Sequence, residues 1–115
     1  SMPMDVKQDS PVIVITALAE CQTQWQEVLW GIEEEGIPWR WQQASGLDVV
    51  AHAWQAANQS ALLVGIACDS QQLVIHYRNL PASAPLFMLM LHEDLQSRRK
   101  AGNNAARLVK GIPFR

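Results

Sequence analysis

The run ALLVGIAC at residues 61–68 constrains the fold of this chain more than any other segment. Its eight residues carry no charge, and polar residues flank the run on both sides. A strand of this kind has to be covered on both faces, as a central strand is in a sheet with helices on each side. The run therefore predicts an open sheet between two layers of helices.

Four further segments have the pattern of strands. VIVIT (12–16) is rich in β-branched residues, which favours a buried strand. In IPWRWQ (37–42) apolar and polar residues alternate, which indicates a strand with one buried face. QLVIHY (72–77), after a turn at Asp69-Ser70, and PLFMLML (85–91) complete the predicted sheet.

Three segments have the spacing of amphipathic helices. The first has apolar residues at i, i+3, i+4 and i+7, namely Trp25, Val28, Leu29 and Ile32. The second follows Gly46 and carries on one side Val49, Val50, Ala53, Trp54 and Ala57. The third is expected within residues 93–110, anchored by Leu95, Ala105, Leu108 and Val109. Four tryptophans are expected in the core: Trp25, Trp39, Trp41 and Trp54.

Strands that alternate with helices predict one α/β domain over residues 11–115, with three layers and a mostly parallel open sheet. Residues 1–10 are polar and are predicted to be disordered, and Ser1 before Met2 is interpreted as a residue left by cloning. PLFMLML is far shorter than the about 20 apolar residues that cross a bilayer, so no membrane segment is expected. The chain shows no secretory signal, and two cysteines outside any metal or redox spacing favour a reducing, cytoplasmic setting.

Motifs for catalysis or nucleotide binding are missing from the sequence. The first strand-to-helix turn, ALAECQTQ (17–24), has no glycine that would let the backbone approach a pyrophosphate, and no GxxxxGK[ST] loop occurs. The three histidines are scattered, and Cys68 at the end of a buried strand is expected to be a packed thiol. These observations favour a protein-binding role over an enzyme.

The charges are unevenly distributed along the chain. Residues 1–50 contain eight acids, whereas residues 98–115 contain six bases and no acid. A solvated basic helix face and a protein partner with an acidic rim both remain open as explanations. Nucleic-acid binding is disfavoured by the overall pI of 5.8.

One face of the first helix is the candidate binding surface. At about 100° per residue, Trp30 falls away from the apolar stripe and shares a face with Glu27 and Glu34. An outward tryptophan is a frequent interface anchor, although it can also lie along its own helix. The acidic run Glu33-Glu34-Glu35 lies at the helix C-terminus, where carboxylates oppose the helix dipole, so it indicates an external cation, a basic partner or a merely soluble helix end. The candidate partner-binding residues are Glu27, Trp30, Glu33 and Glu34.

Four segments closely resemble the small subunit of diol dehydratase-reactivating factors. They are WQEVLWGIEEEGIPWR (25–40), SALLVGIACD (60–69), HYRNLPASAPLF (76–87) and GNNAARLVKGIPFR (102–115). The resemblance extends from about residue 11 to the end and is weaker over residues 41–47 and 88–100. It implies the α/β fold of the dehydratase medium subunit.

The resemblance also implies a role and partners. In that family the small subunit binds a large, actin-like ATPase subunit, forms a hetero-oligomer and exchanges with the look-alike subunit of the dehydratase, so that damaged cobalamin leaves. A glutamate of the helix-end acidic run, which aligns with Glu34, helps to bind a magnesium ion shared with the large subunit. No cofactor is expected on this chain alone, and a bacterial microcompartment is an implied location.

Two other functions remain open at this point. The chain resembles the dehydratase medium subunit itself, which would make it an enzyme component that holds part of the cobalamin site. Its short length and its NNAARLVKGIPFR segment favour the reactivating factor. A domain that binds a small ligand on the same scaffold is the other alternative, because a fold does not fix a function.

Overall fold

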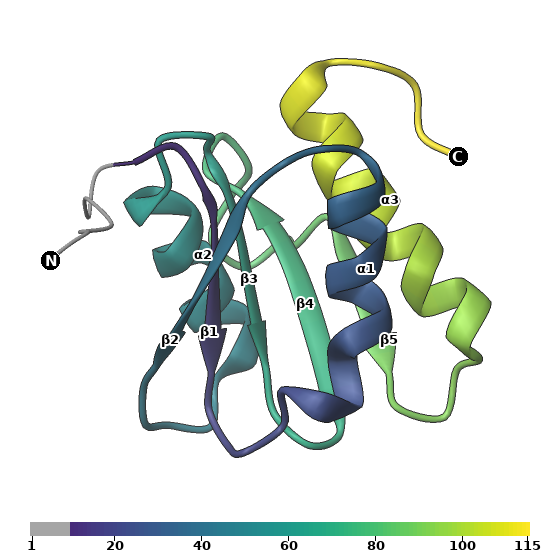
Figure 1. Ribbon diagram of the computed structural model, residues 1–115. Coiled ribbons are helices and arrows are strands. Elements are labelled where there is room, and N and C mark those ends of the chain that lie inside the picture. The colour runs from purple at the N-terminus through teal and green to yellow at the C-terminus, as the bar shows by residue number, and fades with distance from the viewer. Residues whose placement is uncertain (1–9) are drawn as a thin grey trace, which may run out of the picture.

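A computed structural model describes residues 10–115, so the expected disorder of the N-terminal segment lies outside the described residues apart from Ser10. A single five-stranded sheet runs in the order β2-β1-β3-β4-β5 (Figure 1). Its strands are β1 (Ile13–Ala17), β2 (Trp39–Gln43), β3 (Val64–Cys68), β4 (Gln72–Tyr77) and β5 (Phe87–Met90). All five predicted strands are present, and both β1 and β3 are buried along their whole length.

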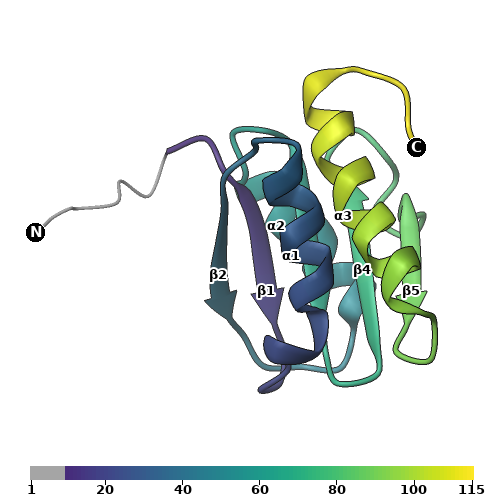
Figure 2. The same ribbon diagram turned by 45° about the vertical axis from the view of Figure 1, so that its right-hand side comes forward.

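Helices cover both faces of the sheet, as the central apolar run predicts. The helices are α1 (Gln26–Glu34), α2 (Val49–Gln59) and α3 (Leu95–Lys110), and a single 3-10 turn, Thr23–Trp25, precedes α1. Connections between parallel strands are right-handed, and the chain steps outward from β1 to β2 and then back to β3. The two crossover helices α1 and α2 therefore lie on opposite faces, and α3 joins α1 (Figures 1 and 2).

The prediction of a mostly parallel sheet is wrong, because the sheet is mixed. Strand β1 pairs in parallel with β2 and β3, whereas β3–β4 and β4–β5 are antiparallel. The turn between β3 and β4 is closed by Asp69, whose carboxylate accepts bonds from the backbone N–H groups of Gln71 and Gln72. A connection of this length can only reverse the chain, since parallel strands need a crossover of a dozen or more residues.

Two expectations about the core need correction. Leu95 is 57% exposed at the first turn of α3, so it is no anchor, and the buried face of this helix is instead made of small and amide side chains from Ala101 to Ala106. Trp25 is fully buried as predicted, although it lies in the 3-10 turn before α1. The other three predicted core tryptophans are only half-buried, because Trp39 and Trp41 lie on the edge strand β2 and Trp54 on the flank of α2.

The two cysteines are neighbours in the same buried cluster as the apolar residues of α1. Both thiols are fully buried, and their Sγ atoms lie 3.4 Å apart without a disulfide. Burial and the neighbouring Cys21 thiol raise the pKa of Cys68. Buried packing of both thiols, with the pKa of Cys68 raised, agrees with the structural role expected from the sequence.

No helix among residues 10–115 is long and apolar enough to cross a membrane.

Candidate functional site

The candidate site is built where α1 and α3 cross. The two helices run side by side on one face of the sheet (Figure 2), and glycines allow their backbones to touch. A Cβ atom on Gly102 would lie 2.0 Å from the carbonyl oxygen of Val28, and one on Gly31 would lie 2.2 Å from the carbonyl oxygen of Arg99. This close approach brings the polar residues of α3 against the acidic face of α1.

Arg99 of α3 bridges two of the candidate carboxylates. Its Nε and Nη2 both lie 3.0 Å from Glu27 Oε2, and its Nη1 lies 2.7 Å from Glu34 Oε2. The buried amide of Asn103 donates from Nδ2 to Glu34 Oε1 at 3.0 Å and to the carbonyl oxygen of Gly31 at 2.8 Å. Each carboxylate oxygen of Glu34 therefore already accepts one hydrogen bond from α3.

Arg99 also contacts the outward-facing side chain of Trp30. The Trp30 side chain is 46% exposed, in agreement with the helical-wheel prediction, and the guanidinium carbon of Arg99 lies 5.6 Å from the centre of its ring. This distance is within the range of a cation–π interaction. Glu27, Trp30 and Glu34 thus form one surface, and a single side chain of the same molecule contacts all three.

The rest of the acidic run has separate partners. Glu35 is only 11% exposed and is paired with Arg107 at 3.0 Å and Lys110 at 2.8 Å, both from α3. Lys110 also donates to the backbone carbonyl of Glu35 at the end of α1, where a cation offsets the negative helix terminus. Glu33 is exposed and accepts a bond from the Trp39 indole at 3.2 Å.

These contacts favour the ionised form of two of the carboxylates. The hydrogen bond from Asn103, together with the charge of Arg99, lowers the pKa of Glu34 against an opposing effect of burial. Hydrogen bonds from Lys110 and then Arg107 lower the pKa of Glu35. Both groups are therefore negatively charged at neutral pH.

The charge asymmetry of the sequence has an internal explanation. Three of the C-terminal bases pair with acids of α1 or of its C-cap, Glu35, so the cations that the acidic run lacks locally come from α3. Sequence reasoning missed Arg99, Asn103, Gly31 and Gly102 as parts of the site. The complementary charges of residues 27–35 and 99–110 were the available signal.

No group of three or more His, Cys, Asp or Glu side chains within residues 10–115 is arranged to hold a metal ion. Glu34 can therefore supply one ligand to a metal, and the remaining ligands would have to come from water or from another molecule. Its half-exposed carboxylate, with 48% of the side chain accessible against 19% for Glu27, is the more accessible of the two acids that Arg99 binds.

Other cavities offer less chemistry. The hollow at the carboxyl ends of β1 and β2, where open α/β sheets commonly bind ligands, measures about 200 Å³ and is lined by Ala17, Leu18, Ala19, Glu20, Gln43 and Ala44. It presents no cation or glycine to a phosphate group. This lining gives little support to the small-ligand alternative.

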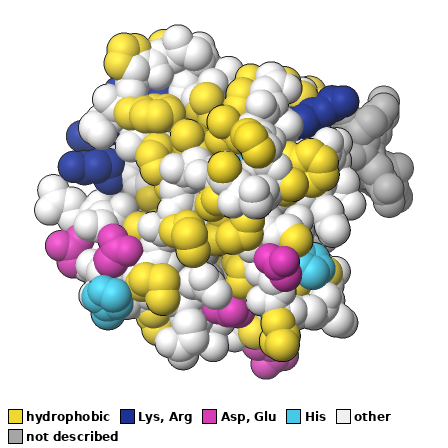
Figure 3. Space-filling model, turned by 180° about the vertical axis from the view of Figure 1, so that it is seen from behind, with side chains coloured by type: hydrophobic (Ala, Val, Ile, Leu, Met, Phe, Trp, Pro, Cys, Tyr) yellow, Lys and Arg dark blue, Asp and Glu magenta, His cyan; other side chains and the backbone are white. Residues whose placement is uncertain are grey.

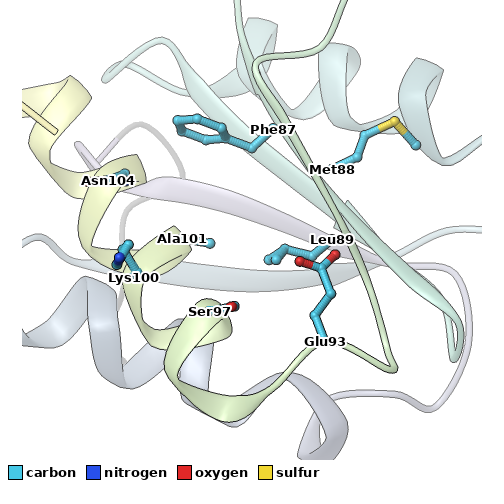
Figure 4. A pocket seen from close by; sticks show the side chains of 8 residues that line it. All are labelled: Phe87, Met88, Leu89, Glu93, Ser97, Lys100, Ala101 and Asn104. Carbon is cyan, nitrogen blue, oxygen red and sulfur yellow. The ribbon is translucent and has the colours of Figure 1, made fainter. Parts of the chain in front are cut away.

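A groove of similar size lies between α3 and β5. Leu89 and Ala101 face one another across it, whereas Met88 points away (Figure 4). Met88 and Met90 are 51% and 40% exposed on the opposite face of the sheet. Hydrophobic side chains gather across the middle of that face of the molecule (Figure 3).

Known proteins place the chain in a family. The model of the dehydratase medium subunit family matches residues 10–115. The propanediol dehydratase-reactivating factor small subunit of Salmonella typhimurium is 62% identical over 112 residues, which cover 97% of each chain. The diol dehydratase-reactivating factor small subunit of Klebsiella michiganensis is 61% identical, with 97% of this chain and 90% of the relative covered. The chain belongs to the diol dehydratase-reactivating factor small subunits.

A solved structure agrees with this assignment. A chain from the structure of diol dehydratase-reactivating factor complexed with ADP and Mg²⁺ is 63% identical and superposes with a TM-score of 0.90, covering 92% of this chain and 98% of that one. The resemblance seen in the sequence is thus confirmed. The match to the medium-subunit model also confirms that the domain shares the scaffold of a dehydratase subunit.

Proposed function

We propose that this chain binds the large ATPase subunit of a diol dehydratase-reactivating factor and takes part in subunit exchange with the dehydratase, so that damaged cobalamin is released. The observation that carries the proposal is the combination of two matches. The chain is about 60% identical to reactivating-factor small subunits, and it also fits the model of a dehydratase subunit over residues 10–115. These two properties support a domain that is suited to both assemblies.

ATP hydrolysis is assigned to the partner in this proposal. The related complex contains ADP and Mg²⁺. The first strand-to-helix turn of this chain, by contrast, has no glycine for a phosphate loop. The small subunit then acts without catalysis of its own, in the cytoplasm or inside a bacterial microcompartment.

The surface around Glu27, Trp30, Glu33 and Glu34 is the proposed contact with the large subunit. Exchange requires an interface that is specific yet reversible, and such interfaces combine a few anchors with a polar rim. A half-exposed indole beside ionised carboxylates supplies both kinds of contact. Glu33 adds an exposed carboxylate on the same helix end.

Glu34 fits the shared magnesium ion that the family resemblance implies. Magnesium prefers hard oxygen ligands and is usually held by one or two carboxylates together with water. Glu34 is ionised, and each of its oxygens accepts only one hydrogen bond, which leaves a lone pair on each. The role of this chain is to present that carboxylate at the boundary between the subunits.

The test measures association with the purified large subunit over a range of Mg²⁺ concentrations. Glu34→Gln keeps the shape of the side chain and is expected to weaken the Mg²⁺-dependent association without unfolding the domain. Glu20→Gln serves as the control, because Glu20 is an exposed acid outside the proposed contact surface. Normal association of the Glu34 variant in Mg²⁺ would show that Glu34 is not a metal ligand.

A further inference from the structure

Arg99 occupies the proposed contact surface before any partner arrives. Its guanidinium lies between Glu27 and Glu34 and over the ring of Trp30. A metal ion that binds the Glu34 carboxylate would meet the positive charge of Arg99 on the same oxygen. Two positive charges that contact the same carboxylate oxygen repel one another.

We propose that Arg99 is an internal latch on this surface. In the free subunit Arg99 forms an ion pair with Glu34, and metal-dependent association with the large subunit requires that this ion pair break. The inference rests on the function proposed above. It assigns a regulatory role to a residue of α3 that the candidate surface on α1 did not include.

The geometry of Arg99 makes release feasible without disrupting the fold. Nε and Nη2 bind Glu27, whereas only Nη1 reaches Glu34. The Glu34 side chain can therefore turn away from Nη1 while the rigid guanidinium keeps its contact with Glu27. The Glu34 side chain is 48% exposed, and an ion pair at such a position contributes little stability. Glu27 is 19% exposed and holds the other side of the guanidinium more firmly.

Four other bases near the surface have partners of their own, whereas Lys100 lines the same hollow as Glu34 and Arg99. Arg107 and Lys110 bind Glu35, and Arg98 donates to backbone carbonyls of Gln24 and Leu91. Arg115 donates to the side-chain oxygen of Asn103. Among the residues that the structure describes, Arg99 is the base that forms an ion pair with the Glu34 carboxylate, and the charge of Arg115 also acts on this group.

The experiment compares Arg99→Met with Arg107→Met in the full chain. Methionine keeps an unbranched apolar stem and removes the charge, and Arg107 pairs with Glu35 instead of Glu34, which makes it the matched control. Association with the large subunit is titrated with Mg²⁺. The latch predicts that Arg99→Met lowers the Mg²⁺ concentration for half-maximal association by about three- to tenfold, the range expected when an exposed ion pair and its repulsion are removed. Arg107→Met should change it by less than about twofold.

Two further variants and a measurement of folding keep the result interpretable. Glu34→Gln combined with Arg99→Met should behave like Glu34→Gln alone, since the latch acts only through Glu34. Arg99→Lys keeps the charge but lacks the planar fork that binds both carboxylates. Its Mg²⁺ concentration for half-maximal association should therefore lie between those of the parent and Arg99→Met, and it replaces the methionine variant if that variant is unstable. A thermal melt of each isolated variant measures its folding.

The outcomes separate the two proposals. If Glu34→Gln weakens association but Arg99→Met raises or does not change the Mg²⁺ requirement, the latch is wrong and the metal site stands. If Glu34→Gln has no effect, both proposals are overturned.

Discussion

Replacement of Gly102 by alanine tests the helix crossing that positions the whole site. The added Cβ would lie 2.0 Å from the Val28 carbonyl oxygen and 3.1 Å from Gly31 Cα, whereas ordinary contacts are 3.4–4 Å. The nearest obstacles are backbone atoms, so a side-chain rotation cannot relieve the overlap and the helices must move apart. Such overpacking costs about 1–3 kcal/mol or more. Alanine recovers up to about 1 kcal/mol through its helix propensity.

The expected net loss for Gly102→Ala is about 2 kcal/mol in the free energy of unfolding. In a domain of this size that lowers Tm by roughly 8 °C. Urea unfolding and a thermal melt followed by circular dichroism measure both values. Lys100→Ala, at an exposed position of the same helix, is the control and should stay within about 0.5 kcal/mol of the parent. A Gly102→Ala variant as stable as the parent would refute the contact between α1 and α3.

Three further outcomes follow from the structure. Trp30→Ala should weaken association with the large subunit while Tm stays nearly unchanged, because the indole is half-exposed; a large fall in Tm would place it in the core. Glu35 has a lowered pKa, so its ion pairs stabilise the fold above its ordinary value of 4.5, and this contribution is lost as pH falls through the lowered pKa. Glu35→Gln should therefore reduce the acid sensitivity of unfolding in urea, and an unchanged pH profile would contradict the pairing. Cys21 and Cys68 should resist a thiol reagent in the native protein and react after unfolding; rapid native reaction would contradict their burial.

The sequence predicted the elements well, because their signals are local. Continuous apolar runs located β1 and β3, and the period of the apolar residues located the buried side of α1 and the outward position of Trp30. The direction of the strands after β3 was predicted wrongly, although the Asp69 turn was recognised and is too short for a crossover.

The buried face of α3 could not be read from hydrophobic periodicity. Its most buried stretch contains Gly102, Asn103 and Asn104, which are small or polar and serve close helix packing and hydrogen bonds. Leu95, which looked like an anchor, lies outside that contact and is exposed.

The candidate surface was only partly predictable for a similar reason. Helical geometry groups Glu27, Trp30 and Glu34 on one face, since their spacing is local. Arg99 lies 72 residues from Glu27 and 65 from Glu34, so its position depends on how α3 packs against α1. Complementary charge could suggest that these segments meet, but only the tertiary structure identifies which base binds which acid.

The most direct test of the proposed role is copurification of this chain with the large subunit of a diol dehydratase-reactivating factor, together with adenosylcobalamin binding to this chain alone. The proposed function predicts a stable complex with the large subunit and no coenzyme binding by the isolated chain. Absence of the complex, or direct binding of adenosylcobalamin by this chain, would contradict it and favour a component of the dehydratase itself.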